Sequence, residues 1–151
     1  MRAMRIKRIL VPVDFSEPSL AALRHAIELA RPLKATVDVL HVVEAVAYAP
    51  MVGATVDLDQ LREEREREAR RQLDRLVATL GKGRGRKRAL LRVGTAARSI
   101  VDEAKRRGAD LIVMATEGRH GIGRWLLGSV AERVVRTAGC PVLIVPPRRS
   151  R

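Results

Sequence analysis

Aromatic residues and cysteines are scarce in this chain of 151 residues, and each shortage narrows what the protein can be. Phe15, Tyr48 and Trp125 are the only aromatic residues. The core must therefore be aliphatic, and the rings are too few for a platform on which single-stranded bases would stack. The single Cys140 excludes an internal disulfide, which favours a reducing cytoplasm.

Long apolar runs are also missing. No stretch approaches the roughly 18 residues that a membrane span needs, and residues 1–5 lead into a strand-like segment without the apolar stretch of a secretory signal. We expect a cytoplasmic protein that does not cross a membrane. No composition shift or internal repeat marks a boundary, so residues 1–151 are expected to form a single domain.

Positive charge is abundant. Lys and Arg number 30 and Asp and Glu number 17, which gives a net charge of +13. Such a surface attracts phosphates and nucleic acid over long distances, and the basic segments 82–88 and 148–151 would contact them. A general bias toward arginine on a well-solvated surface explains the same total. We prefer this second interpretation, because net charge identifies a partner only weakly.

The hydrophobic pattern predicts alternating strands and helices. Apolar or β-branched runs predict strands at 8–13, 36–43, 89–93, 110–115 and 141–146, and apolar residues at helical spacing predict helices at 19–31, 58–80, 95–107 and 129–138. This alternation predicts an α/β fold, with a doubly wound five-stranded parallel sheet, helices on both faces and right-handed crossovers. In such a sheet the ligand crevice lies beyond the carboxyl ends of the strands, where the strand order reverses.

Capping and helix-breaking residues predict the element boundaries. Ser16 or Ser19 would cap the first helix, and Pro32 would end it. Asp57 would cap the second helix, whose dense charges we expect to face solvent. Ser129-Val-Ala-Glu132 has the spacing of a capping box at the start of the last helix.

The segment after the fourth predicted strand carries the most binding chemistry. Residues 115–129 read Ala-Thr-Glu-Gly-Arg-His-Gly-Ile-Gly-Arg-Trp-Leu-Leu-Gly-Ser. Glycines let backbone N–H groups approach an anion, and a helix start favours phosphate. Ser129 would add a hydroxyl donor, and Arg119 and Arg124 would add charge-assisted hydrogen bonds. The same residues also fit a structural loop in which the glycines make turns and Ser129 only caps the helix.

Several segments together resemble the universal stress protein A family over almost the whole chain. They are residues 9–16, 40–43, 110–114, 127–134 and 140–145. Nucleotide-binding members of that family carry Gly, two residues, Gly, nine residues and then Gly-Ser or Gly-Thr. Gly118, Gly128 and Ser129 match this motif, whereas Ala115 replaces its first glycine. The methyl group of Ala115 could crowd a phosphate or force a shift of the backbone, and Glu117 adds a carboxylate that would repel a phosphate unless it pointed away.

The resemblance implies a fold, a ligand and an assembly. The fold would be of the adenine-nucleotide alpha-hydrolase-like type, with strand order 3-2-1-4-5. The ligand would be ATP or a related adenine nucleotide, with Mg²⁺ beside it. The protein would form a homodimer through its last strand, at Val142, Leu143, Ile144 and Val145. The implied nucleotide-binding residues are Pro12, Val13, Asp14, Val42, Met114, Ala115, Gly118, Arg119, Gly128, Ser129, Val130 and Ala131.

Three functions remain as alternatives. The first is a stress-response module that binds a nucleotide and acts through an unidentified protein partner. The second is a dimer without nucleotide, which Ala115 and Glu117 favour. The third is a binder of nucleic acid or another polyanion through the basic surface. No nucleophile–base pair, lysine-bearing phosphate loop or metal-ligand spacing is evident in the sequence, so we expect no enzyme, and any ATP hydrolysis would be slow.

Overall fold

Five strands and four helices alternate along the chain in the computed structural model, which describes residues 5–45, 57–81, 85–116 and 127–146. The predicted alternation is confirmed. The elements in chain order are β1 (Arg8–Pro12), α1 (Glu17–Leu33), β2 (Thr36–Val43), α2 (Leu58–Thr79), β3 (Lys87–Val93), α3 (Ala96–Arg107), β4 (Leu111–Ala115), α4 (Ser129–Thr137) and β5 (Val142–Val145).

The strands form one parallel sheet in the order β3-β2-β1-β4-β5. This confirms the expected fold and places the reversal of strand order between β1 and β4. There the ladder pairs Ile9 with Leu111 and Leu10 with Ile112 and then ends, whereas β1 stays paired with β2 as far as Pro12. Strands β1 and β4 are therefore no longer hydrogen-bonded to each other toward their carboxyl ends, where ligands bind in folds of this type.

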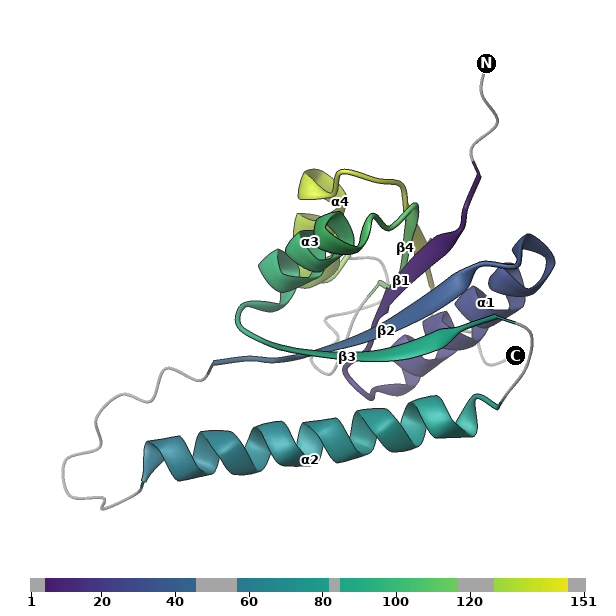
Figure 1. Cartoon of the computed structure of the whole chain (residues 1–151). Coiled ribbons are helices and arrows are strands. Elements are labelled where there is room, and N and C mark those ends of the chain that lie inside the picture. Colours follow the sequence, from purple (N-terminus) through teal and green to yellow (C-terminus); the bar gives the residue numbers. More distant parts are fainter. Residues whose placement is uncertain (1–4, 46–56, 82–84, 117–126, 147–151) are drawn as a thin grey trace, which may run out of the picture.

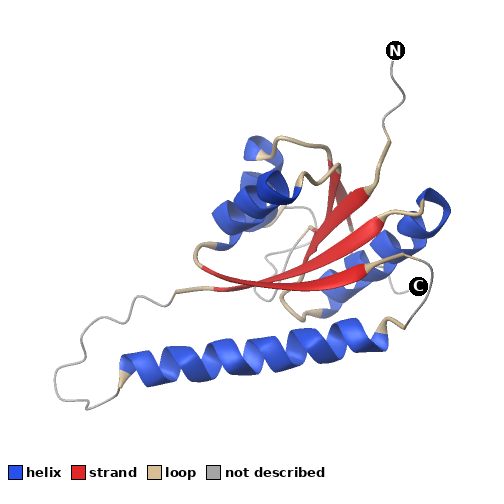
Figure 2. Cartoon of the chain, viewed as in Figure 1, coloured by secondary structure: helices blue, strands red, loops and turns tan. Residues whose placement is uncertain are grey.

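Helices cover both faces of the sheet. In Figure 1, α1 and α2 lie on one face and α3 and α4 on the other, and Figure 2 shows the strands as the middle layer. The side chains of neighbouring strand residues point to opposite faces of the sheet. Val113 belongs to the same hydrophobic cluster as Leu23 of α1 and Leu73 of α2, whereas Ile112 belongs to the cluster that contains Ile100 of α3. The buried core of the described residues is aliphatic apart from Met114, in keeping with the scarcity of rings.

The first helix begins as predicted but ends differently. Ser16 is the N-cap, and its side-chain oxygen accepts a hydrogen bond from the Ser19 N–H. Pro32, predicted to end the helix, lies inside its last turn. Helix α1 continues to Leu33 because Lys34 terminates it in a left-handed conformation, donating its N–H to Ala30 and Arg31. The proline thus removes one hydrogen bond near the helix end without breaking the helix.

The predicted capping box at the start of α4 is wrong. Gly128 is the N-cap, Ser129 is the first helical residue, and no side chain caps the helix. A capping side chain must belong to the N-cap residue itself, and Gly128 has none. The Ser129 hydroxyl is therefore not used to begin the helix. At its other end α4 stops at Thr137 with Ala138 as C-cap, one residue before the predicted end at residue 138.

The long helix α2 has the predicted solvated face. Asp57 caps it, and exposed pairs such as Arg62–Glu66 and Arg67–Glu63 run along its surface. Leu58, in its first turn, is 49% exposed, whereas Ala69 and Leu73 are buried against the sheet. No helix in the described part of the chain combines the length and apolar character that a membrane crossing requires.

The strand that follows α2 begins earlier than predicted. Its expected start was Ala89, but β3 begins at Lys87, where the ladder with β2 pairs Lys87 with Val37. The Val37 N–H already donates to the carbonyl of Arg86 at 2.8 Å. Register with the neighbouring strand, rather than apolar composition, therefore sets this boundary.

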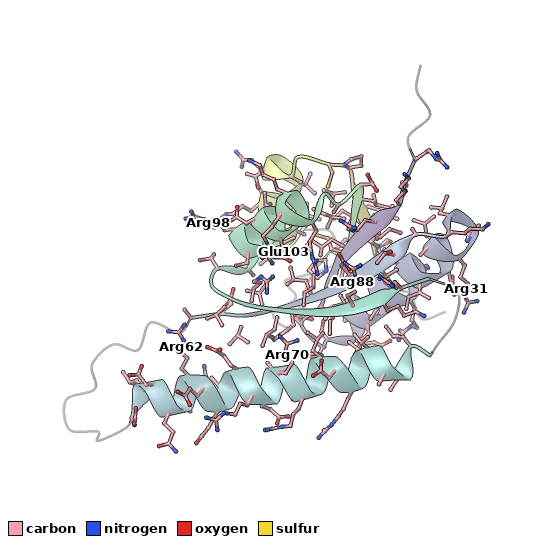
Figure 3. The ribbon with its side chains drawn as sticks, viewed as in Figure 1. Arg31, Arg62, Arg70, Arg88, Arg98 and Glu103 are labelled. Atoms are coloured by element: carbon pink, nitrogen blue, oxygen red, sulfur yellow. The ribbon has the colours of Figure 1, made fainter. Side chains whose placement is uncertain are left out.

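Two buried carboxylates lie between α3 and the sheet. Glu103 is 3% exposed and lies on the sheet side of α3 (Figure 3). It accepts two hydrogen bonds from Arg92 at 2.9 and 3.1 Å and others from Arg106 at 2.7 and 2.8 Å. Asp38 of β2 is fully buried, with the Nε atoms of Arg8 and Arg107 at 3.9 and 3.7 Å from its Oδ2. These ion pairs attach α3 to strands β1, β2 and β3.

Replacing Glu103 tests this attachment. We expect Glu103→Gln to lower the free energy of unfolding by about 1–3 kcal/mol, because hydrogen bonds to a charged group are lost while the partly exposed arginines regain some water. Asp102→Asn is the matched control, since Asp102 is exposed and pairs only at 3.6 Å with Arg98. That change should cost less than about 1 kcal/mol. Urea unfolding measures both, and equal losses would contradict a structural role for the buried cluster.

Two serines at helix starts should behave differently. Ser16→Ala removes the N-cap of α1 and should cost about 1–2 kcal/mol. Ser129→Ala should change the stability of the free protein by less than about 0.5 kcal/mol, because this serine caps nothing. Thermal melting of the two variants without ligand makes the comparison, and a large loss for Ser129→Ala would mean that its hydroxyl does cap α4.

Candidate functional site

The chain beyond β1 is fixed at the carboxyl edge of the sheet. The Val13 N–H donates to the Leu40 carbonyl at 2.8 Å, and the Val13 carbonyl accepts from Nδ1 of His41 at 2.7 Å. The His41 ring in turn packs against Phe15, with ring centroids 4.5 Å apart. Phe15 has a φ of 66°, a conformation that costs free energy in a residue other than glycine and that the surrounding contacts maintain.

Asp14 forms the turn that leads into α1. Its Oδ1 accepts hydrogen bonds from the backbone N–H of Ser16, at 3.0 Å, and from the Ser16 hydroxyl. Its own N–H donates to Oγ of Ser19 at 3.3 Å. The turn-forming role that aspartate often has is therefore present here. The same bonds hold the half-buried Asp14 side chain in one orientation at the end of β1.

The end of β4 and the start of α4 lie together. The Gly128 N–H donates to the Thr116 carbonyl at 2.7 Å, so the chain leaves β4 and returns to α4 at one point. The first hydrogen bond inside α4 runs from the Glu132 N–H to the Gly128 carbonyl at 2.9 Å. The N–H groups of the helix's first residues precede this bond and have no acceptor within the helix. They favour an anion at this position.

Most of the predicted nucleotide-binding residues can now be located. Gly118 and Arg119 lie outside the described residues. Val13, Met114, Ala115 and Ala131 are buried, so their backbone is what they can offer to a ligand. The others, at the carboxyl edge, are half-buried apart from the exposed Ser129: Pro12 and Asp14 near the end of β1, Val42 in β2, and Gly128 and Val130 at the start of α4.

The methyl group of Ala115 packs into the core. Ala115 is 7% exposed and belongs to the hydrophobic cluster under α1, together with Val13 and Val145. Residues of α4, such as Ala131, belong to the cluster on the opposite face. The methyl group that replaces the motif glycine is thus directed away from the start of α4, and the predicted crowding of a phosphate does not follow from its position.

The described part of the carboxyl edge is mostly acidic. Arg98 in the first turn of α3 is the main exception. Positive potential for a phosphate must therefore come from the N–H groups at the start of α4 and from Arg119 and Arg124 in the sequence. The acidic residues, at strand ends and helix starts, are Asp14, Glu17, Glu44, Asp57, Asp59 and Glu132.

Neither a reactive thiol nor a metal-binding cluster is evident among the described residues near this site. Burial raises the pKa of the half-buried Cys140 thiol, so its reactive thiolate is disfavoured. Within the part of the chain that the structure describes, no three His, Cys, Asp or Glu side chains form a group that could hold a metal ion.

One element of the site was not predicted from sequence. This element is the contact between His41 and Phe15, which the sequence patterns did not indicate. The two lie far apart in the sequence, and the parallel pairing of β1 with β2 brings them together. A histidine near the end of one strand and an aromatic residue just beyond the neighbouring strand were the available signals, but only the register joins them.

Known proteins share both the sequence pattern and the fold. A model of the universal stress protein family matches residues 5–146. A universal stress protein of Methanocaldococcus jannaschii is 38% identical over 141 residues, which cover 92% of this chain and 81% of that protein. The family model therefore covers every strand and helix described above, from β1 to β5.

Solved structures agree with this match. The universal stress protein UspA from Lactobacillus plantarum superposes with a TM-score of 0.75 at 30% identity, covering 95% of this chain and 99% of that one. A universal stress protein in complex with cAMP superposes with a TM-score of 0.61 at 27% identity, covering 94% and 98%. Sequence, strand order and superposition agree, and the chain belongs to the universal stress protein family.

Proposed function

We propose that this universal stress protein binds ATP or a related adenine nucleotide at the carboxyl edge of its sheet, and that it acts through a protein partner. The hydrogen bond from Gly128 to Thr116 is the observation that carries the proposal. It holds the start of α4, whose first N–H groups have no acceptor within the helix, beside the point where β1 and β4 separate. The structure with cAMP, 27% identical to this chain, supports an adenine nucleotide as the ligand class.

The surroundings fit the two ends of such a ligand. Pro12, Val13 and Val42 offer an apolar surface and fixed backbone groups to an adenine and its ribose, and Asp14 is held beside them. The start of α4 suits the phosphates. Mg²⁺ would be held mainly by phosphate oxygens and water.

Binding rather than turnover is the proposed activity. Cys140 is half-buried with a raised thiol pKa. Among the described residues, no three His, Cys, Asp or Glu side chains form a group that could hold a metal ion. A module of this kind would report or hold nucleotide while a partner contacts its surface. We place it in the cytoplasm, which the single cysteine favours.

Calorimetry with MgATP tests the site. Gly128→Val should reduce binding below detection, because a branched side chain would stand where phosphate approaches the helix start; the φ of −59° at this position accepts valine. Ser129→Ala should weaken binding by about 1.5–3 kcal/mol through loss of a hydrogen bond to a charged group. Ala115→Gly should change the affinity by less than about twofold, while removing a buried methyl group worth about 0.8 kcal/mol.

The matched control is Ser99→Ala, which alters a serine near the start of the neighbouring helix α3 and should leave ATP binding unchanged. If neither the wild type nor any variant shows a heat of binding, the nucleotide proposal is rejected. The dimer without nucleotide is then the remaining function. Heat with Ala115→Gly alone would mean that the methyl group does block the phosphates.

We further propose that two copies associate through β5. This strand is an edge of the sheet, and its Leu143 is 43% exposed while Val142 and Ile144 are half-buried. An uncovered apolar edge strand invites pairing with another strand. Association of Val142, Leu143, Ile144 and Val145 with the same residues of a second copy would cover it.

Light scattering at micromolar concentration tests the dimer. Leu143→Lys should shift the protein toward the monomer, because a charge would enter the covered edge. Ile144→Lys should do the same, but Ile144 also packs on the core, so its effect includes a loss of stability. Leu33→Lys is the control, since Leu33 is similarly exposed at 42% on α1 and should leave the dimer intact. A monomeric wild type would contradict the proposal.

A further inference from the structure

The amino edge of the sheet, opposite the proposed nucleotide site, is strongly basic. All five strands begin at this edge and all four helices end there, and the starts of β1 and β3 and the ends of α1 and α3 are rich in Lys and Arg. We call this set the basic edge. It consists of Arg5, Lys7 and Arg8 at the start of β1, Arg31 and Lys34 at the end of α1, Arg86, Lys87 and Arg88 at the start of β3, and Lys105, Arg106 and Arg107 at the end of α3.

Backbone hydrogen bonds bring these ends side by side. The Thr36 N–H donates to the Lys7 carbonyl and the Val37 N–H to the Arg86 carbonyl, each at 2.8 Å. The starts of β1, β2 and β3 therefore form one row about 10 Å across. The side chain of Arg8 donates to the Arg107 carbonyl, which adds the end of α3. In Figure 3, Arg31 lies at the end of the molecule opposite Arg62 of α2.

The carboxylates near this edge are either buried among arginines or hydrogen-bonded to its backbone. Asp38 and Glu103 are buried among arginines, as described above. Asp110 accepts the backbone N–H groups of Lys7 and Arg8 at 2.8 and 2.9 Å. The exposed side chains of the basic edge include Lys7, Lys34 and Arg86, which no described carboxylate pairs with.

Helix dipoles and composition explain only part of this charge. Each helix carboxyl end carries about half a negative charge, so α1 and α3 together offset about one of the basic side chains. Arginine is also frequent elsewhere, as on α2, which carries Arg62, Arg65 and Arg67. The described part of the opposite edge nevertheless carries Asp14, Glu17, Glu44 and their acidic neighbours. Among the described residues, the two edges therefore differ in charge.

We propose that the basic edge binds the phosphodiester backbone of nucleic acid without reading its sequence. A row of exposed cations matches a chain of closely spaced phosphates. The basic edge holds no aromatic residue, so bases have no ring on which to stack, and phosphate contacts alone position a protein without specifying a sequence. Among the described residues of the basic edge and its immediate neighbours, Leu33 is the large exposed apolar side chain, which is too little to insert into a lipid surface.

The proposed nucleic-acid surface and the proposed nucleotide site lie at opposite edges of the same sheet. One ligand therefore need not displace the other. This separates the two proposals experimentally, because failure of ATP binding leaves the basic edge unchanged.

Fluorescence anisotropy with a labelled duplex of about 20 base pairs, titrated with the full-length protein over a salt series, tests the proposal. The edge variant combines Lys7→Gln, Lys34→Gln and Arg86→Gln. We expect wild-type binding at low salt that falls linearly on a log–log salt plot, and equal affinity for duplexes of two sequences. The edge variant should bind about tenfold or more weakly, with a salt slope reduced by about three.

The control variant combines Arg24→Gln, Arg98→Gln and Arg133→Gln, which remove the same net charge from exposed positions elsewhere. It should lose less than about threefold in affinity. Equal losses for the two variants, or no wild-type binding at low salt, would overturn the proposal. So would displacement of the duplex by ATP at constant ionic strength. Binding to phosphatidylserine vesicles but not to the duplex would also overturn it and identify a lipid surface instead.

Discussion

The short ladder between β1 and β4 is the constraint on which the rest of the arrangement depends. This ladder joins β1 to β4. The chain adds β2 and β3 on one side of β1, and then adds β4 and β5 on the other side. Because the ladder ends after Leu10 and Ile112, β1 and β4 separate toward their carboxyl ends, at the position proposed for the nucleotide. Everything proposed for the nucleotide site, from the fixed backbone at Val13 to the start of α4, is arranged around this separation.

Much of this architecture could be predicted from the sequence, because buried parallel strands are continuous apolar runs and the helices have apolar periodicity. Details that depend on a single backbone angle could not. Ser129 and Glu132 have capping-box spacing, yet the conformation of Gly128 makes glycine the cap. Pro32 did not stop a helix that Lys34 terminates. The direction of the Ala115 methyl group depends on the strand's register and on α1, which no local pattern reveals.

Oppositely charged side chains pair in two settings in this molecule, on the surface and in the interior. Along α2 they pair on the surface within the helix, where each pair contributes little. Around Glu103 and Asp38 they are buried, and these pairs connect α3 to three strands. The buried pairs also have an electrostatic effect at the amino edge, because they enclose its acidic groups and leave lysines and arginines on the outside. The polarity of the surface thus follows partly from how the core is held together.

The bond between Gly128 and Thr116 has a consequence for how such proteins diversify. Since β4 and α4 are held to each other at this point, the segment between them can gain or lose residues without moving either element. Lengthening a closed segment is cheap, at about 0.6 kcal/mol for each doubling of its length. Ligand preference and scaffold stability can therefore evolve separately, with new specificities arising in the segment while the sheet and its helices stay the same.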